Sequence, residues 1–259
     1  MPTYFKHSCL LFKKGQMKRH VLFLLLASAS LSANAQILTD SFAGTTLNAS
    51  KWSVYEPAST AGGGSGTVRV NSGNVVLTSR GTLITNQDFL GEVDITGKFR
   101  FDGAADRFMV WTRTTGSSTN PWSDQDNGIN FRFQQDVSQV GIGEWFVGGL
   151  SNPAGAYLNN SQIYYSDLAV ASTSLPGGVW LDFRVRDTGS QVELYLGNLS
   201  VPMISATTSL RAGYKVSFNN SYNPDQVVSI DSLTIVPEPS TLALVLFSGV
   251  LASNCRRRS

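Results

Sequence analysis

Two acidic residues with one residue between them give the first candidate chemistry. Glu92 and Asp94 flank a valine, and alternation along a strand would place both side chains on the same face of a sheet. Two carboxylates on one face can divide glycoside hydrolysis between them, one as nucleophile and the other as acid. The alternating partners of this stretch are apolar, so we favour two charges on a solvated sheet face. A carboxylate-only glycoside hydrolase is the alternative.

A second acidic pair precedes a glycine. Asp124 and Asp126 stand two residues apart and Gly128 follows, which resembles part of a calcium loop without the downstream bidentate glutamate. Asp126-Asn127-Gly128 is also ordinary turn chemistry. We expect a turn and no metal or other cofactor, with calcium on Asp124 and Asp126 as the alternative.

Two tryptophans are candidates for stacking on sugar rings. Trp122 and Trp145 lie in or beside loop-like stretches, where an exposed indole can pack against the apolar face of a sugar. The other three tryptophans, Trp52, Trp111 and Trp180, fall in strand patterns. We expect those three in the core.

The N-terminal 35 residues have the pattern of a secretory signal. A charged pair at 18–19 follows Met17, an apolar run covers 21–27, and Ala33 and Ala35 form a small-x-small site. We therefore predict that translation starts at Met17 and that signal peptidase cleaves after Ala35.

The C-terminal residues form a second targeting segment. Residues 242–252 are uncharged and mostly apolar, and Arg256, Arg257 and Arg258 follow them. The 15 residues 240–254 are a marginal span beside the usual requirement of about 20. The arginines would stay in the cytoplasm.

The prolines before this span fix an extended backbone at Pro237, Glu238 and Pro239. This order of parts resembles the PEP-CTERM sorting signal of Gram-negative bacteria, over about the last two dozen residues (237–259). The resemblance implies processing by an exosortase, a membrane transpeptidase-like enzyme, in a producer that exports exopolysaccharide.

Removing both ends changes the chemistry of the chain. Eight of its 20 basic residues lie there, which leaves 12 basic and 17 acidic residues in 36–236 and a net charge of −5. This balance argues against nucleic acid as a partner. Both cysteines and both histidines also lie in the ends, so the domain has no disulfide, thiol nucleophile, imidazole base or zinc site built from them.

Residues 36–236 read as one all-β domain. Apolar and polar residues alternate over five runs, which predicts strands and, with the turn residues between them, an antiparallel sandwich: 93–101, 129–133, 179–185, 192–196 and 227–236. The turn residues 187–190 predict a hairpin between the third and fourth runs.

The start of this domain resembles concanavalin A-like (laminin G-like) jelly rolls. Phe42, Leu47 and Trp52 have the spacing with which that family packs the entry of its sandwich; the hairpin at 179–197 and the run 228–233 resemble its last strands. Related glucanases carry Glu-x-Asp-x-(x)-Glu on one strand. Here Thr96 and Gly97 stand where the third carboxylate would be.

We therefore expect an exported protein, transiently anchored in the membrane by its C-terminal helix and then held at the cell surface or in the extracellular matrix. Its sandwich would be a binding or structural module associated with exopolysaccharide, and not an enzyme. The glycoside hydrolase and a sandwich without any ligand are the alternatives.

Overall fold

The computed structural model describes residues 36–57, 65–89, 92–103, 107–115, 128–147, 157–158, 163–210, 213–220 and 226–237. Within these ranges the chain is almost entirely β-strand, with one short 3-10 turn at Gln135–Val137. The predicted signal peptide and the tail from Glu238 onward lie outside the described residues. Among the described residues no helix is long and apolar enough to cross a membrane.

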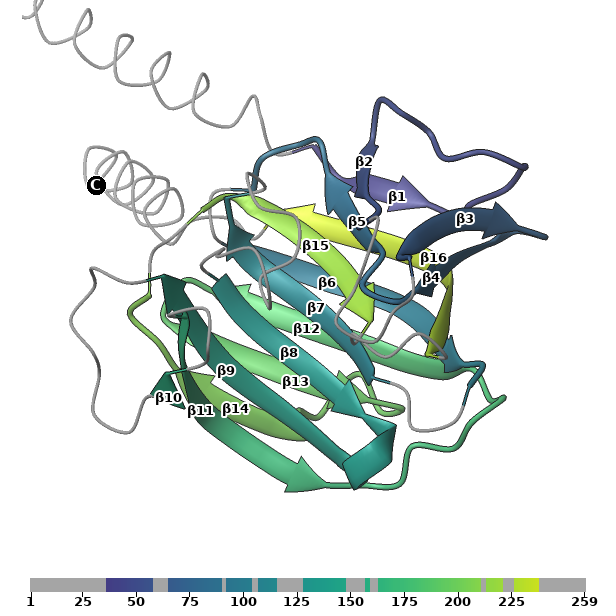
Figure 1. Cartoon of the computed structure of the whole chain (residues 1–259). Helices are drawn as coiled ribbons and strands as arrows, with labels where there is room; N and C mark the ends of the chain where they lie inside the picture. The colour runs from purple at the N-terminus through teal and green to yellow at the C-terminus, as the bar shows by residue number, and fades with distance from the viewer. Residues whose placement is uncertain are drawn as a thin grey trace, which may run out of the picture. The chain divides into compact units, whose positions relative to one another are not determined.

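The described strands form two sheets in which every pairing is antiparallel (Figure 1). Sheet A has the order β14-β13-β12-β6-β16-β4-β3, with β1 also paired to β16. Its strands are β14 (Ile204–Thr207), β13 (Gln191–Leu196), β12 (Leu181–Thr188), β6 (Glu92–Phe101), β16 (Val227–Pro237), β4 (Asn74–Thr78), β3 (Thr67–Asn71) and β1 (Leu38–Asp40).

Sheet B has the order β10-β11-β9-β8-β7-β15-β5-β2. Its strands are β10 (Tyr157–Leu158), β11 (Ile163–Ser172), β9 (Gln139–Val147), β8 (Gly128–Gln134), β7 (Arg107–Thr114), β15 (Lys215–Asn220), β5 (Thr82–Thr85) and β2 (Trp52–Tyr55). The two sheets pack face to face, and the predicted antiparallel β sandwich is confirmed.

The core between the sheets is rich in phenylalanine. Phe99 of β6 lies 4.7 Å from Phe108 of β7 and 4.8 Å from Phe133 of β8 between ring centroids. Phe183 of β12 packs edge-on against the same rings. Buried aromatic pairs in these geometries add stabilisation beyond the area they bury, so the two sheets are joined through this cluster.

The predicted entry of the sandwich is confirmed. Phe42 and Trp52 are buried, their rings lie 6.0 Å apart, and Leu47 packs against the same core. Trp52 also contacts Phe218 at 6.1 Å and donates its indole N–H to Asp40 Oδ2 at 2.8 Å. The first turn of the domain is therefore fixed by packing and by one side-chain hydrogen bond.

The predicted hairpin is also confirmed, since β12 pairs with β13 across the turn at Gly189. Its strand, however, begins at Leu181 rather than Val179, which is exposed. The expectation that Trp180 lies in the core is wrong. Trp180 is half-buried, and the Arg100 guanidinium lies 4.7 Å from its ring centroid, so this indole interacts with a cation instead of the core.

Candidate functional site

The outer face of sheet B carries a cluster of buried side chains separate from the core between the sheets. Alternation along β7 sends Phe108 into the core, whereas Met109 and Trp111 belong to the second cluster. Trp145 of β9 completes that cluster, and Tyr165 of β11 packs against it. A sheet face exposed only to solvent would not need such a cluster.

The aromatic members of this cluster are in direct contact. The rings of Trp111 and Trp145 meet edge to face at 5.5 Å, and Trp145 stacks on Tyr165 at 5.0 Å. Trp111 Nε1 donates to Asn219 Oδ1 at 3.1 Å. These contacts hold the indole of Trp111 in one orientation on the sheet.

Strand register aligns polar residues beside these rings. Trp111 pairs with Asn130 of β8, Asn130 with Gly143 of β9, and Gly143 with Asp167 of β11. A second row of paired residues lies two positions along each strand. There Met109 pairs both with Asn219 and with Arg132, so Asn130, Asn219 and Arg132 share one face.

These three polar side chains are buried, and each has an atom without a hydrogen-bond partner. Asn130 and Asn219 are 0% exposed and Arg132 is 8% exposed. The unpartnered atoms are both amide atoms of Asn130, Nδ2 of Asn219 and Nε of Arg132. Leaving a buried polar group unsatisfied costs about 1–3 kcal/mol, and such groups call for an explanation. A molecule that supplies the missing partners is one.

Gly143 lies opposite Asn130 in the strand register. A Cβ at this position would lie 3.1 Å from the Ser166 carbonyl oxygen, 3.5 Å from Asp167 Oδ1 and 3.8 Å from Trp145 Nε1. A side chain at this position would therefore crowd the Ser166 carbonyl and contact the side chains of Asp167 and Trp145.

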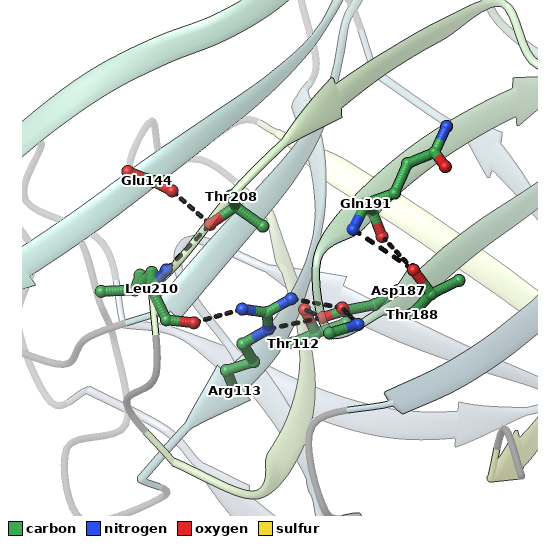
Figure 2. Close-up of polar contacts among 9 residues, drawn as sticks. Thr112, Arg113, Glu144, Asp187, Thr188, Gln191, Thr208 and Leu210 are labelled. Atoms are coloured by element: carbon green, nitrogen blue, oxygen red, sulfur yellow. Dashed lines mark hydrogen bonds and ion pairs between the residues drawn. The ribbon is translucent and has the colours of Figure 1, made fainter. Parts of the chain in front are cut away.

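A second polar cluster lies between the sheets (Figure 2). Asp187 of β12 accepts hydrogen bonds from Thr112 Oγ1 at 2.7 Å, from Arg113 Nε at 2.9 Å and from the Gly189 backbone N–H at 2.9 Å. Arg113 Nη2 also donates to Asp187, and Nη1 donates to the Leu210 carbonyl. The two charged side chains are 1% and 0% exposed, so this pair is buried and fully bonded.

A bulge turns Arg113 into this position. Its φ of 60° is left-handed, and the pairing of β7 with β15 shifts register between Lys215 and Ser217. A bulge places two consecutive residues opposite one. Thr112 and Arg113 can therefore both point toward Asp187 on the facing sheet.

The outer face of sheet A carries the acidic pair that suggested hydrolysis. Both oxygens of Asp94 accept hydrogen bonds from Arg184, whose Nε lies 2.8 Å from Oδ1. Glu92 is half-buried on the same strand. Both residues lie on the outer face of the sheet, as alternation predicts, but they are half-buried rather than fully solvated, and the carboxylate of Asp94 is held by a guanidinium.

Tyr195 on the same face is electrostatically perturbed. Burial, together with the hydrogen bond that its hydroxyl donates to Glu193 Oε2 at 2.7 Å and the charge of that carboxylate, raises the pKa of Tyr195 above its ordinary value. Arg184 lies over the ring, 5.0 Å from its centroid. These groups form an ion-paired surface.

The prediction of Trp145 as an exposed stacking residue is wrong, because the side chain is 1% exposed. It lies within β9 rather than in a loop, and its ring packs between those of Trp111 and Tyr165. Trp145 therefore forms part of the wall of the cluster on sheet B.

The remaining predicted residues lie outside the described part of the chain. They are Trp122, Asp124, Asp126, Ala33, Ala35, Glu238, Pro239, Arg256, Arg257 and Arg258. Pro237 is the exception, as the last residue of β16. Within the described ranges, no group of three His, Cys, Asp or Glu side chains is placed to hold a metal ion.

The sequence did not single out Asn130, Asn219 or Arg132. Alternation with Ile129 and Phe131 predicted the face on which Asn130 and Arg132 lie, but every residue of β8 is buried on both faces. Polar and apolar residues alternate with a period of two whether the outer face of a strand is solvated or buried, so the pattern does not separate the two cases. The feature that distinguishes these residues is the missing hydrogen-bond partner, which depends on the side chains that neighbouring strands bring next to them.

Comparison with known proteins identifies the fold. No protein-family model matches the chain, and no curated protein sequence matches it. Solved structures, in contrast, match this chain. A β-glucanase of Bacillus licheniformis has a TM-score of 0.53 at 12% identity, covering 78% of this chain and 98% of that one.

Two further structures give the same result. The exoplasmic/lumenal domain of VIP36, in a form bound to Ca2+ and Man3GlcNAc, has a TM-score of 0.55 at 14% identity over 78% of this chain and 89% of that one. A pseudo β-1,3-glucanase of Mycobacterium tuberculosis has a TM-score of 0.52 at 15% identity over 78% and 98%. At these identities the likeness shows the fold alone, a concanavalin A-like β sandwich.

Proposed function

We propose that the sandwich is a non-catalytic carbohydrate-binding module whose site is the outer face of sheet B. The observation that carries this proposal is the group of three buried polar side chains, Asn130, Asn219 and Arg132, with unpartnered atoms beside Trp111. Groups of this kind are costly unless something binds them.

The donors and acceptors of this group suit a sugar. An asparagine amide offers an acceptor oxygen and two N–H donors, and the arginine Nε offers one donor. Adjacent hydroxyl groups both donate and accept, so a pair of them can satisfy the amide of Asn130. Tyr165 is half-buried and supplies apolar surface of the kind that packs against a sugar ring, and it rests on the buried cluster that contains Trp111. Two of the similar folds support the choice of ligand, since one is named as a glucanase and one was solved with a mannose glycan.

The placement of carboxylates supports binding rather than hydrolysis. Among the strands of sheet B, acidic residues occur only on β9 and β11, as Glu144 and Asp167. Glu144 accepts a hydrogen bond from Thr208, and Asp167 is ion-paired with Arg132. Hydrolysis by the usual route needs two carboxylates on either side of one bond. Glu144 precedes Trp145 on β9 and so lies on the opposite face of the sheet. The strands of the outer face therefore provide one carboxylate, that of Asp167, and Arg132 is ion-paired with it.

Affinity gel electrophoresis of the full chain tests the proposal. Neutral glucans and mannans set into the gel should retard the wild type, and Asn130→Leu should remove the retardation. Asp182→Asn is a matched control, because Asp182 lies on the outer face of sheet A. Retardation that survives Asn130→Leu would place the binding elsewhere, and reducing-sugar release by the wild type would favour a hydrolase.

We further propose that the protein is exported and processed at its C-terminus, as the sequence predicts. The proposed motif begins within the sandwich, since Pro237 closes β16 and pairs with Val93 of β6. Expression with and without an exosortase, followed by size and location, tests this. N-terminal sequencing of the exported product should begin at Gln36. A product of the same size that stays in the membrane in both hosts would overturn the proposal.

A further inference from the structure

The basic residues on the strands of sheet B around the site are all paired with carboxylates. All four basic residues of β7, β8, β9, β11 and β15 have a carboxylate partner. These pairs are Arg107 with Asp136, Arg113 with Asp187, Arg132 with Asp167, and Lys215 with Asp88. Of the four, the pair formed by Arg132 and Asp167 lies beside Asn130, since Asp167 is in the same row as Asn130 and Arg132 is in the next row.

The geometry of this pair leaves part of the guanidinium unused. Arg132 Nη2 donates to Asp167 Oδ1, whereas the buried Nε has no partner. An arginine presents parallel N–H groups that match a carboxylate. Without Asp167, the site would therefore hold a donor group suited to an anionic ligand.

Asp167 is the outer member of the pair. Its side chain is 45% exposed and that of Arg132 is 10% exposed. Gly141 allows this arrangement, because a Cβ there would lie 2.6 Å from Arg132 Nη2. A ligand that approaches the face therefore meets the carboxylate before the guanidinium.

We propose that Asp167 is a specificity-determining residue that restricts the site to uncharged sugars and excludes uronic acids. This inference rests on the proposed carbohydrate-binding function and adds the class of sugar to it. A carboxylate on the ligand would be repelled by Asp167, and it would have to displace that side chain to reach Arg132. A hydroxyl group can bond to Arg132 Nε or Asn130 while the ion pair stays in place.

Matched polysaccharides test this selectivity. Laminarin, barley β-glucan and mannan are each compared with the same polymer after oxidation of its C6 hydroxyls to carboxylates, in affinity gel electrophoresis with the full chain. The wild type should bind a neutral polymer at least tenfold more tightly than its oxidised form. Asp167→Asn should shift the ratio of the two affinities about tenfold toward the oxidised polymer.

Two controls separate selectivity from overall charge and from misfolding. Asp182→Asn removes an equally exposed carboxylate, at 48%, from an ion pair on the other sheet, and it should leave the preference unchanged. The double variant Asp167→Asn/Arg132→Gln should lose the shift toward the oxidised polymer, because the cation is gone. Thermal melting shows that each variant is folded.

The outcomes separate the two proposals. Equal binding of neutral and oxidised polymers by the wild type, or an unchanged preference in Asp167→Asn, overturns the role of Asp167 and leaves carbohydrate binding standing. Preference of the wild type for the oxidised polymers does the same. Binding to none of these polymers overturns the proposed function, and this inference with it.

Discussion

Two regions of the sandwich bury polar side chains, and they differ in whether the buried polar atoms have hydrogen-bond partners. Between the sheets, Arg113 and Asp187 are sealed from solvent and have partners for their charged groups. On the outer face of sheet B, Asn130 and Asn219 are equally buried, yet amide atoms of both have no partner. Burial alone therefore does not distinguish a structural residue from a binding residue. The two regions differ in how complete their hydrogen bonding is, and the proposed binding site is the region with unsatisfied atoms.

The largest expected effect comes from breaking the inner cluster. Asp187→Leu should lower the free energy of unfolding by about 3–5 kcal/mol, because it leaves a buried guanidinium without its counter-charge. Urea denaturation measures this. The double variant Arg113→Met/Asp187→Leu should recover most of the loss, since it removes both charges together. A loss below 1 kcal/mol in the single variant would contradict a structural role for the pair.

The opposite result is expected on the outer face. Asn130→Leu should leave the free energy of unfolding unchanged or raise it by about 1 kcal/mol, because it removes an unsatisfied amide from a buried position. The same variant should abolish retardation by neutral glycans. Urea denaturation and affinity electrophoresis on one preparation check both parts. A loss of stability comparable to that of Asp187→Leu would erase the contrast between the two regions.

A smaller effect is expected from the ion pair on the outer face of sheet A. Arg184 and Asp94 are 26% and 20% exposed, and partly solvated pairs contribute about 0–1 kcal/mol. Asp94→Asn should therefore change the free energy of unfolding by no more than that and leave glycan binding intact. Loss of glycan binding in this variant would move the site to sheet A.

The smallest effect concerns Tyr195 and appears only at alkaline pH. The pKa of Tyr195 is raised in the folded protein by burial and by Glu193, so stability is fully present below the ordinary pKa of about 10. It falls as the pH rises toward the folded value. Tyr195→Phe should flatten this fall in urea denaturation between pH 9 and pH 11. Glu193→Gln should lower the pKa of Tyr195, followed by phenolate absorbance against Tyr195→Phe. An unchanged pKa would exclude Glu193 as a cause.

Much of the fold could be predicted from the sequence because its signals are local. Alternation between Val93 and Phe101 predicted β6, and the spacing of Phe42, Leu47 and Trp52 predicted how the domain begins. These patterns depend on neighbours within a few residues, and two facing sheets are the ordinary way to bury them. The same local reasoning misplaced Trp180, because a cation from another strand covers it.

The candidate site could not be predicted in the same way. Asn130 and Asn219 are 89 positions apart in the sequence, and they share a face only because β7 lies between β8 and β15. Whether the amide of Asn130 has a hydrogen-bond partner depends on side chains from several other strands. The pattern of residues along β8 alone therefore does not predict it.

The pairing of β1 with β16 has a mechanical consequence. Leu38 lies opposite Ile235, so the chain enters and leaves the sandwich at one point, and β16 is also held along its length by β6. A tether at Pro237 that pulls along the strand would load the pairs with β6 in shear, so that they resist together. The same force on the start of β1 would load its three pairs with β16. The last strand of the sandwich thus has more backbone pairing to resist such a force than the first strand has.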